Sequence, residues 1–113
     1  MLKASAADLA KRLPGPRTPR WPGGERFATA FEHGSLLVEL YAPVGRDPQG
    51  AHDRDEVYFV IAGNGDFIAG GERSPFSAGD ALFVAAGVDH RFENFTADFR
   101  TWVVFYGPVG GEH

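Results

Sequence analysis

Short stretches rich in apolar residues, each closed by a glycine-containing turn, follow one another from residue 25 to near the carboxyl terminus. The clearest is Val57 to Ile61, where β-branched and aromatic residues favour an extended strand. The same pattern predicts strands at residues 25–34, 35–43, 55–62, 65–70, 81–86, 90–95 and 99–107. About eight short strands at this spacing indicate an all-β sandwich or barrel.

One glycine turn carries a specific expectation about how neighbouring strands connect. Gly63-Asn64-Gly65 separates two predicted strands, and glycine and asparagine tolerate the positive φ of tight hairpin turns. We therefore predict that the strands on either side of residues 63–65 form a hairpin.

The first 24 residues follow a different pattern. Ser5 and Asp8 predict a capped helix that carries Leu9 on its apolar face and ends at Pro14. Four prolines between residues 14 and 22 then favour an extended arm laid over the domain. The predicted organisation is a helix and arm at 1–24, a barrel at 25–107 and a tail at 108–113.

The predicted strand at 55–62 has apolar residues on both faces. Val57, Phe59 and Ile61 point away from the side that carries Tyr58. A sheet with one wet face should instead alternate apolar and polar residues. The proline-rich arm, a partner subunit or both must cover this face, and we favour a homodimer.

Composition excludes several classes of function for this chain, whose 113 residues suit one domain. There is no cysteine, so disulfides, zinc–thiolate sites and thiol catalysis are excluded, and any metal must be held by nitrogen and oxygen. The formal net charge of −4, without a basic patch, argues against a nucleic-acid partner.

Neither a membrane span nor a signal peptide is expected. No stretch approaches the ~18 apolar residues that a spanning helix requires. Asp8, Lys11 and Arg12 interrupt the amino-terminal run before it could form the apolar region of a signal peptide. We therefore expect a cytoplasmic protein.

A charged turn precedes the strand at 55–62. His52 and Glu56 would lie ~13 Å apart on a straight strand, too far to bind one ion, so they can meet only if the chain bends between them. The polar residues Asp53-Arg54-Asp55 are suited to such a bend. We expect Asp53 and Asp55 to face water.

A second stretch, "GDALFVAAGVDHRFEN" at residues 79–94, completes a pattern with the first. Together the two stretches resemble the two signature motifs of the cupin superfamily, in particular its small single-domain, conserved-barrel (type 2) members. In the first motif His52, Glu56 and Gly63 match, while Gly50 stands where the family has another histidine. In the second, the matching positions are Gly79, Gly87, His90 and Asn94, and Ala85 replaces a proline.

This resemblance implies an antiparallel double-sheet jelly-roll barrel with a metal site inside. The implied ligands of a divalent ion are His52, Glu56 and His90, a donor set suited to Fe, Mn, Zn or Ni. Three protein ligands leave coordination positions open for water or substrate. Because Gly50 removes one ligand, Gln49 is a possible fourth ligand through its amide oxygen.

The residues around the implied site leave alternatives open. Tyr58, Val60 and Phe92 are expected to line the pocket, although core packing would explain Tyr58 equally well, and Glu39 interrupts an apolar strand nearby. The three implied ligands could also belong to a metal-free pocket. No catalytic residue is identifiable from the sequence.

We expect a metal-binding cupin that acts on or binds a small molecule, with dioxygenase or isomerase chemistry as examples. The alternative is a non-catalytic small-molecule-binding or sensing module, with or without metal. His33, at a turn, and His113, at the terminus, are expected to be solvated rather than ligands.

Overall fold

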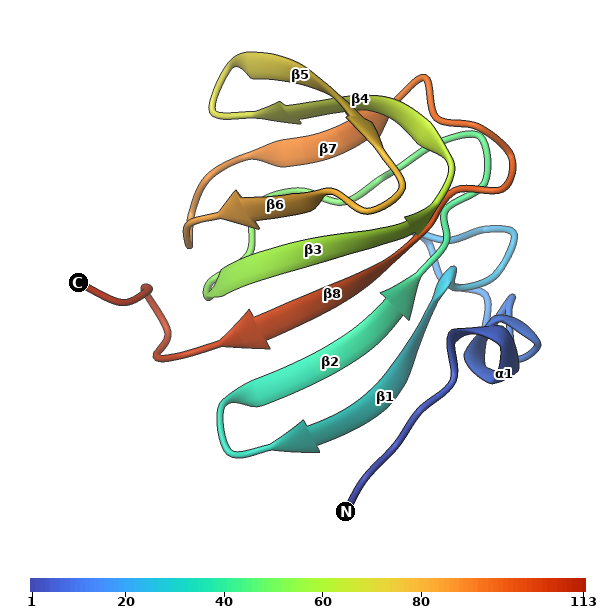
Figure 1. The fold of residues 1–113 in the computed structure, drawn as a ribbon, viewed down its shortest axis with the longest axis horizontal. Coiled ribbons are helices and arrows are strands. Elements are labelled where there is room, and N and C mark those ends of the chain that lie inside the picture. Colours follow the sequence, from blue (N-terminus) through green and yellow to red (C-terminus); the bar gives the residue numbers. More distant parts are fainter.

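Eight antiparallel strands and one short helix make up the protein, described here for residues 1–113 from a computed structural model (Figure 1). The helix is α1 (Ala6–Ala10). The strands are β1 (Phe27–His33), β2 (Leu36–Tyr41), β3 (Asp55–Ala62), β4 (Asn64–Ala69), β5 (Glu72–Ser77), β6 (Ala81–Val84), β7 (His90–Glu93) and β8 (Arg100–Tyr106).

The strands form two sheets, which confirms the predicted all-β, double-sheet fold. Five strands pair in the order β1-β2-β8-β3-β6, and three pair in the order β5-β4-β7. Figure 1 draws the strands of the three-stranded sheet beyond the β6 edge of the larger sheet, with β7 nearest to β6. The side chains that point between the sheets make up the interior of the barrel.

Strand β5 is the one strand that the pattern did not predict. Only Phe76 of its six residues is buried, so the strand shows almost no apolar alternation. It pairs with β4 alone and therefore forms an edge of its sheet, which is where a residue such as Pro75 is tolerated.

The predicted hairpin at residues 63–65 is wrong. Strand β3 belongs to the five-stranded sheet and β4 to the three-stranded one, so the glycine-rich segment carries the chain from one sheet to the other. Glycine is needed there because of close approach: a Cβ at Gly63 would lie 2.6 Å from the Cα of Phe99, and one at Gly65 would lie 2.8 Å from the Cα of Phe95.

The amino-terminal helix forms at the predicted N-cap but ends at Ala10, before the expected end at Pro14. Ser5 is the N-cap, and its hydroxyl accepts the backbone N–H of Asp8 at 3.3 Å. Leu9 is buried, and α1 contacts β1 and β2. The structure contains no helix with the length and apolar character needed to cross a membrane.

The apolar core fills one half of the space between the sheets. Its centre is Phe92, whose ring centroid lies between 4.7 and 5.2 Å from those of four aromatic neighbours. These neighbours are Tyr58, Phe67, Phe76 and Phe99. Tyr41 and Val103 of the same buried cluster extend into the other half of the interior, where polar groups join them and form the candidate site.

The outer face of the five-stranded sheet remains apolar and partly uncovered. Phe59 is 48% exposed and Phe83, on the neighbouring β6, is 58% exposed. Val57 pairs with Phe83 and Phe59 with Trp102 across the sheet. The helix contacts β1 and β2, on the other side of β8, so it does not account for the exposed part near β3 and β6.

Candidate metal centre

Three side chains with metal-binding atoms meet between the two sheets. His52 precedes β3, Glu56 lies in β3, and His90 begins β7 of the other sheet. One potential ligand atom from each lies within 4.8 Å of the others. His90 Nε2 is 2.7 Å and His52 Nδ1 is 3.2 Å from the same oxygen, Oε1 of Glu56.

A bend in the chain and a backbone hydrogen bond bring the three side chains together. The chain bends at Asp53 and Arg54, immediately before β3 begins, so His52 can turn back toward Glu56. The backbone N–H of Gly87, in the turn before β7, donates to the carbonyl oxygen of His52 at 2.8 Å. The two motif segments are therefore held against each other by the backbone.

The environment of His90 fixes which nitrogen faces the site. The carbonyl oxygen of Val88 can only accept, so His90 Nδ1 donates to it, over 2.9 Å. Nε2 then faces Glu56, and as a neutral imidazole it presents a lone pair to a carboxylate oxygen. Such a contact requires a proton or a cation between the two groups.

Burial and pairing act in opposite directions on the two buried ionisable groups. Burial by itself raises the pKa of Glu56, but its hydrogen bonds with His52 and His90 outweigh burial and lower the pKa. Burial by itself lowers the pKa of His90, but its contacts with Glu56 and the Val88 carbonyl outweigh burial and raise the pKa. Both shifts favour the charged forms of Glu56 and His90 and so oppose the effect of burial.

The second oxygen of Glu56 provides a test of whether a metal fits. Glu56 is 1% exposed, and its Oε2 is buried without any hydrogen-bond partner. A buried carboxylate oxygen without a partner is costly. One carboxylate and two imidazoles converge here, so the residues present fit a divalent cation that takes both nitrogen and oxygen ligands.

Gln49 is oriented by a buried aspartate that the sequence did not single out. Asp47 is 7% exposed and can only accept, so the amide nitrogen of Gln49, 2.8 Å from its carboxylate, must be the donor. The amide oxygen of Gln49 then faces the hydroxyl of Tyr58, at 3.2 Å. That hydroxyl is 3.1 Å from His90 Nε2, so Gln49 presents an oxygen next to the three-residue site.

Asp47 holds other parts of the barrel as well. Its carboxylate accepts the hydroxyl of Tyr41 and the backbone N–H groups of Gln49 and Phe92. Burial, followed by the negative charge of Asp47, raises the pKa of Tyr41. Asp47 thus ties together β2, β7 and the loop that carries Gln49. The sequence showed it only as a polar residue before a proline.

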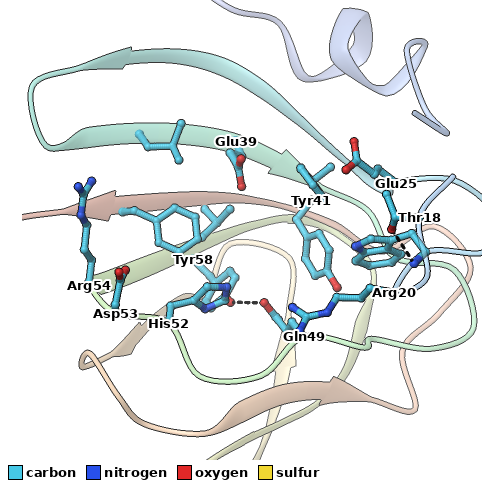
Figure 2. A pocket seen from close by; sticks show the side chains of 15 residues that line it. Thr18, Arg20, Glu25, Glu39, Tyr41, Gln49, His52, Asp53, Arg54 and Tyr58 are labelled. Atoms are coloured by element: carbon cyan, nitrogen blue, oxygen red, sulfur yellow. Dashed lines mark hydrogen bonds between the residues drawn. The ribbon is translucent and has the colours of Figure 1, made fainter. Parts of the chain in front are cut away.

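A cavity of about 530 Å³ opens beside His52 (Figure 2). Tyr58 lines it as predicted, together with residues of β2, β8 and the amino-terminal arm. Val60 and Phe92 do not line it, because the aromatic cluster of the other half of the barrel packs around them. The arm contributes Thr18, Arg20 and Trp21, and Glu25, immediately after the arm, also lines the cavity.

The two aspartates of the charged turn before β3 were both expected to face water, and only one of them does. Asp53 is exposed as expected. Asp55 does not face water: it is 4% exposed and accepts the backbone N–H groups of Glu112 and Ala86, both at 2.9 Å, which lower its pKa. Arg54 donates to the carbonyl oxygen of Ser35 at 3.2 Å rather than pairing with an aspartate. His33 and His113 are exposed.

Comparison with known proteins identifies the family. The model of the cupin domain family matches residues 37–105, which is more than half of the chain. An uncharacterized protein of Streptomyces coelicolor, SCO3923, is 40% identical over 76 residues that cover 66% of this chain and 72% of that protein. The chain therefore belongs to the cupin domain family.

Solved structures agree with this assignment of the fold. TT1209 from Thermus thermophilus is 24% identical with a TM-score of 0.69, and the match covers 96% of this chain and all of that one (100%). DMSP lyase DddQ from Ruegeria pomeroyi is 28% identical with a TM-score of 0.60, and the match covers 74% of this chain and 48% of that one.

Proposed function

We propose that this cupin binds a divalent metal ion through His52, Glu56 and His90, and that the ion helps to hold a small molecule in the adjacent cavity. The observation that carries the proposal is the buried Oε2 of Glu56, which has no partner in the protein. A cation among the three side chains supplies the missing compensation. The donor set suits Fe, Mn, Zn or Ni.

The protein's own residues define what the ion would meet. When bound, such an ion supplies Lewis-acid or oxygen-activating chemistry. The side chain of His52 is 31% exposed, while those of Glu56 and His90 are buried. The site is therefore open on the His52 side, toward the cavity. Gln49 presents its oxygen beside Tyr58, and we propose it as the fourth donor in place of the histidine that Gly50 replaces.

Enzymatic use of the ion is the finer part of the proposal. A lyase is among the structures similar to this chain, which supports chemistry on a small molecule, and dioxygenase and isomerase reactions remain the other candidates. The second candidate function is a non-catalytic binding or sensing module. Gly50 favours it, because a site with fewer protein ligands holds its ion less tightly.

Metal titration tests the proposal directly. Calorimetry of chelator-treated protein with Fe(II), Mn(II), Zn(II) and Ni(II) near neutral pH should detect binding that His90→Ala abolishes. His33→Ala removes an exposed imidazole from a turn and should leave the affinity unchanged. Equal affinity in wild type and His90→Ala, or no binding of any of the four ions, would favour the metal-free pocket.

Elemental analysis of protein purified without added metal separates the two candidate functions. If iron is found, oxygen uptake in the presence of candidate small molecules tests for an oxygenase. A bound ion with no oxygen uptake and no turnover of any ligand that binds would favour the sensing module.

A further inference from the structure

Glu39 is a carboxylate inside the barrel that the metal centre does not use. It lies in β2 between Leu37 and Tyr41 on the inward face, and all three side chains line the cavity. It is partly buried and takes part in no hydrogen bond or ion pair within the protein. Its charge is therefore left for water, or for a ligand that enters the cavity, to compensate.

No side chain of the protein forms an ion pair with Glu39. Two arginines line the same cavity, but Arg54 donates to the carbonyl oxygen of Ser35 and Arg20 is an exposed residue of the arm. Burial raises the pKa of Glu39, the charge of His52 lowers it, and the charges of Glu25, Glu56 and Glu32 raise it by smaller amounts. Three of the four charged groups that act on the pKa of Glu39 are carboxylates.

The sheet register places Glu39 opposite the candidate metal centre. Glu39 pairs with Val103 of β8, and Val103 pairs with Tyr58 of β3. Two strand spacings put the Cα atoms of Glu39 and Tyr58 about 10 Å apart. Figure 2 shows the Glu39 carboxylate pointing toward the side of the cavity where His52 and Tyr58 lie. A small molecule in the cavity can therefore contact Glu39 with one end and the candidate metal centre with the other.

We propose that the ligand of this cavity carries an ammonium group, bound by Glu39, and an oxygen function at its other end, held at the metal centre. The proposal rests on the metal-binding function proposed above. A hydroxyl group facing Glu39 would satisfy a hydrogen bond but leave its charge uncompensated. The aromatic side chains of Trp21, Phe27 and Tyr41 line the same cavity, which suits the methylene groups and the charge of an aliphatic amine.

Matched ligands separate the ammonium group from a neutral donor. Mn(II)-loaded protein is titrated by calorimetry with 4-aminobutyrate, 5-aminopentanoate and 6-aminohexanoate, each compared with the ω-hydroxy acid of the same chain length. At least one amino acid should bind wild type about tenfold more tightly than its hydroxy counterpart, as expected for a charge pair shielded from water.

Variants of Glu39 assign the effect to this side chain. Glu39→Gln should reduce the preference to less than about twofold while leaving the affinity for the hydroxy acid unchanged. Glu39→Asp shortens the side chain by one methylene, so the best ligand should become the next longer amino acid. Glu32→Gln, which removes the same charge from an exposed position of β1, should keep the wild-type preference. Thermal melts of each variant check that the barrel is intact.

Three results would overturn the proposal: no amino acid preferred over its hydroxy partner, hydroxy acids preferred, or a preference that survives in Glu39→Gln. An unchanged optimum in Glu39→Asp would likewise show that another group meets the ammonium. The metal titration made beforehand keeps the two proposals apart. Failure to bind any of the four ions contradicts the metal function, whereas failure to prefer amines with Mn(II) or another of these ions bound contradicts only the assignment of Glu39.

Discussion

The two halves of the barrel interior are built on opposite principles. In one half Phe67, Phe76, Phe92 and Phe99 pack ring against ring with no polar atom among their side chains. In the other half, buried carboxylates and imidazoles hold one another through hydrogen bonds. Tyr58 marks the boundary: its ring packs edge-on against Phe92 at 5.0 Å, while its hydroxyl contacts Gln49 and His90.

The difference shows which half carries stability and which carries chemistry. Burial of aromatic side chains is favourable wherever they pack well. Buried charges are stable only with specific partners, and one oxygen of Glu56 has none. We infer that the aromatic half stabilises the barrel strongly enough to support a polar half that is incomplete until it binds something.

The largest expected effect is on the aromatic half. Phe92→Ala removes a ring that is 1% exposed and has aromatic neighbours on several sides. We expect the free energy of unfolding, measured in urea, to fall by about 3–5 kcal/mol. Val44→Ala, at a position that is 63% exposed, should change it by less than about 0.5 kcal/mol. A small loss in Phe92→Ala would contradict the division of roles between the two halves.

A smaller stability loss is expected when the polar half is disturbed. Asp47→Asn places a donor where four donors now converge, so the free energy of unfolding should fall by about 1–3 kcal/mol. The same change frees the Gln49 amide, so metal affinity should fall by about tenfold. Asp53→Asn, at an exposed position next to His52, is the matched control for both measurements. Unaltered metal affinity in Asp47→Asn would mean that Gln49 orientation does not matter to the site.

The outer face of the larger sheet differs from both halves of the interior, because its apolar side chains are exposed. Phe59 on β3 and Phe83 on β6 are exposed diagonal neighbours, since Phe83 pairs with Val57 and Phe59 with Ala81. We propose that a second copy of the chain covers them. Sedimentation at micromolar concentration should give a mass near twice 12.2 kDa. Phe83→Lys should give the monomer mass. A monomeric wild type would show that this face is left uncovered.

The smallest expected effect is the pH dependence of the metal-free polar half. The pKa of Glu56 is lowered from 4.5, so its contribution to stability is present above that pH and is lost as pH falls through the folded-state pKa. The pKa of His90 is raised from 6.5, so its contribution is complete below that pH and is lost as pH rises through the folded-state pKa. The stability that this pair contributes should therefore be greatest between pH 4.5 and pH 6.5.

Urea unfolding across this range, with chelator present, measures the effect. His90→Gln should remove the alkaline decline, while His33→Gln should keep it. Saturating Zn(II) should also remove the decline, because a metal-bound imidazole is neutral and is held in place by the ion. An alkaline decline that persists in His90→Gln would assign it to another group.

Local patterns in the sequence were enough to predict most of the strands, and the resemblance to the cupin motifs implied the three converging side chains. The residue numbers along β3 are enough to tell which side chains share a face, because successive residues of a strand point to opposite sides. The spacing of His52 and Glu56 and the glycine before His90 lie within two short segments, and the resemblance to the cupin motifs places all three in one site. The N-cap at Ser5 likewise depends on residues only three positions apart.

Only the tertiary structure decided which segments meet. Gly63-Asn64-Gly65 has the local chemistry of a hairpin, and it became a crossing between sheets because β3 pairs with β6 and β8 instead of β4. Asp55 looked like a solvated acid, but it is buried because its carboxylate accepts N–H groups from residues 86 and 112, far away in the chain. Glu39 faces the metal centre only because β8 lies between β2 and β3. Long-range pairing determines such positions, and the local sequence around these residues carries no record of it.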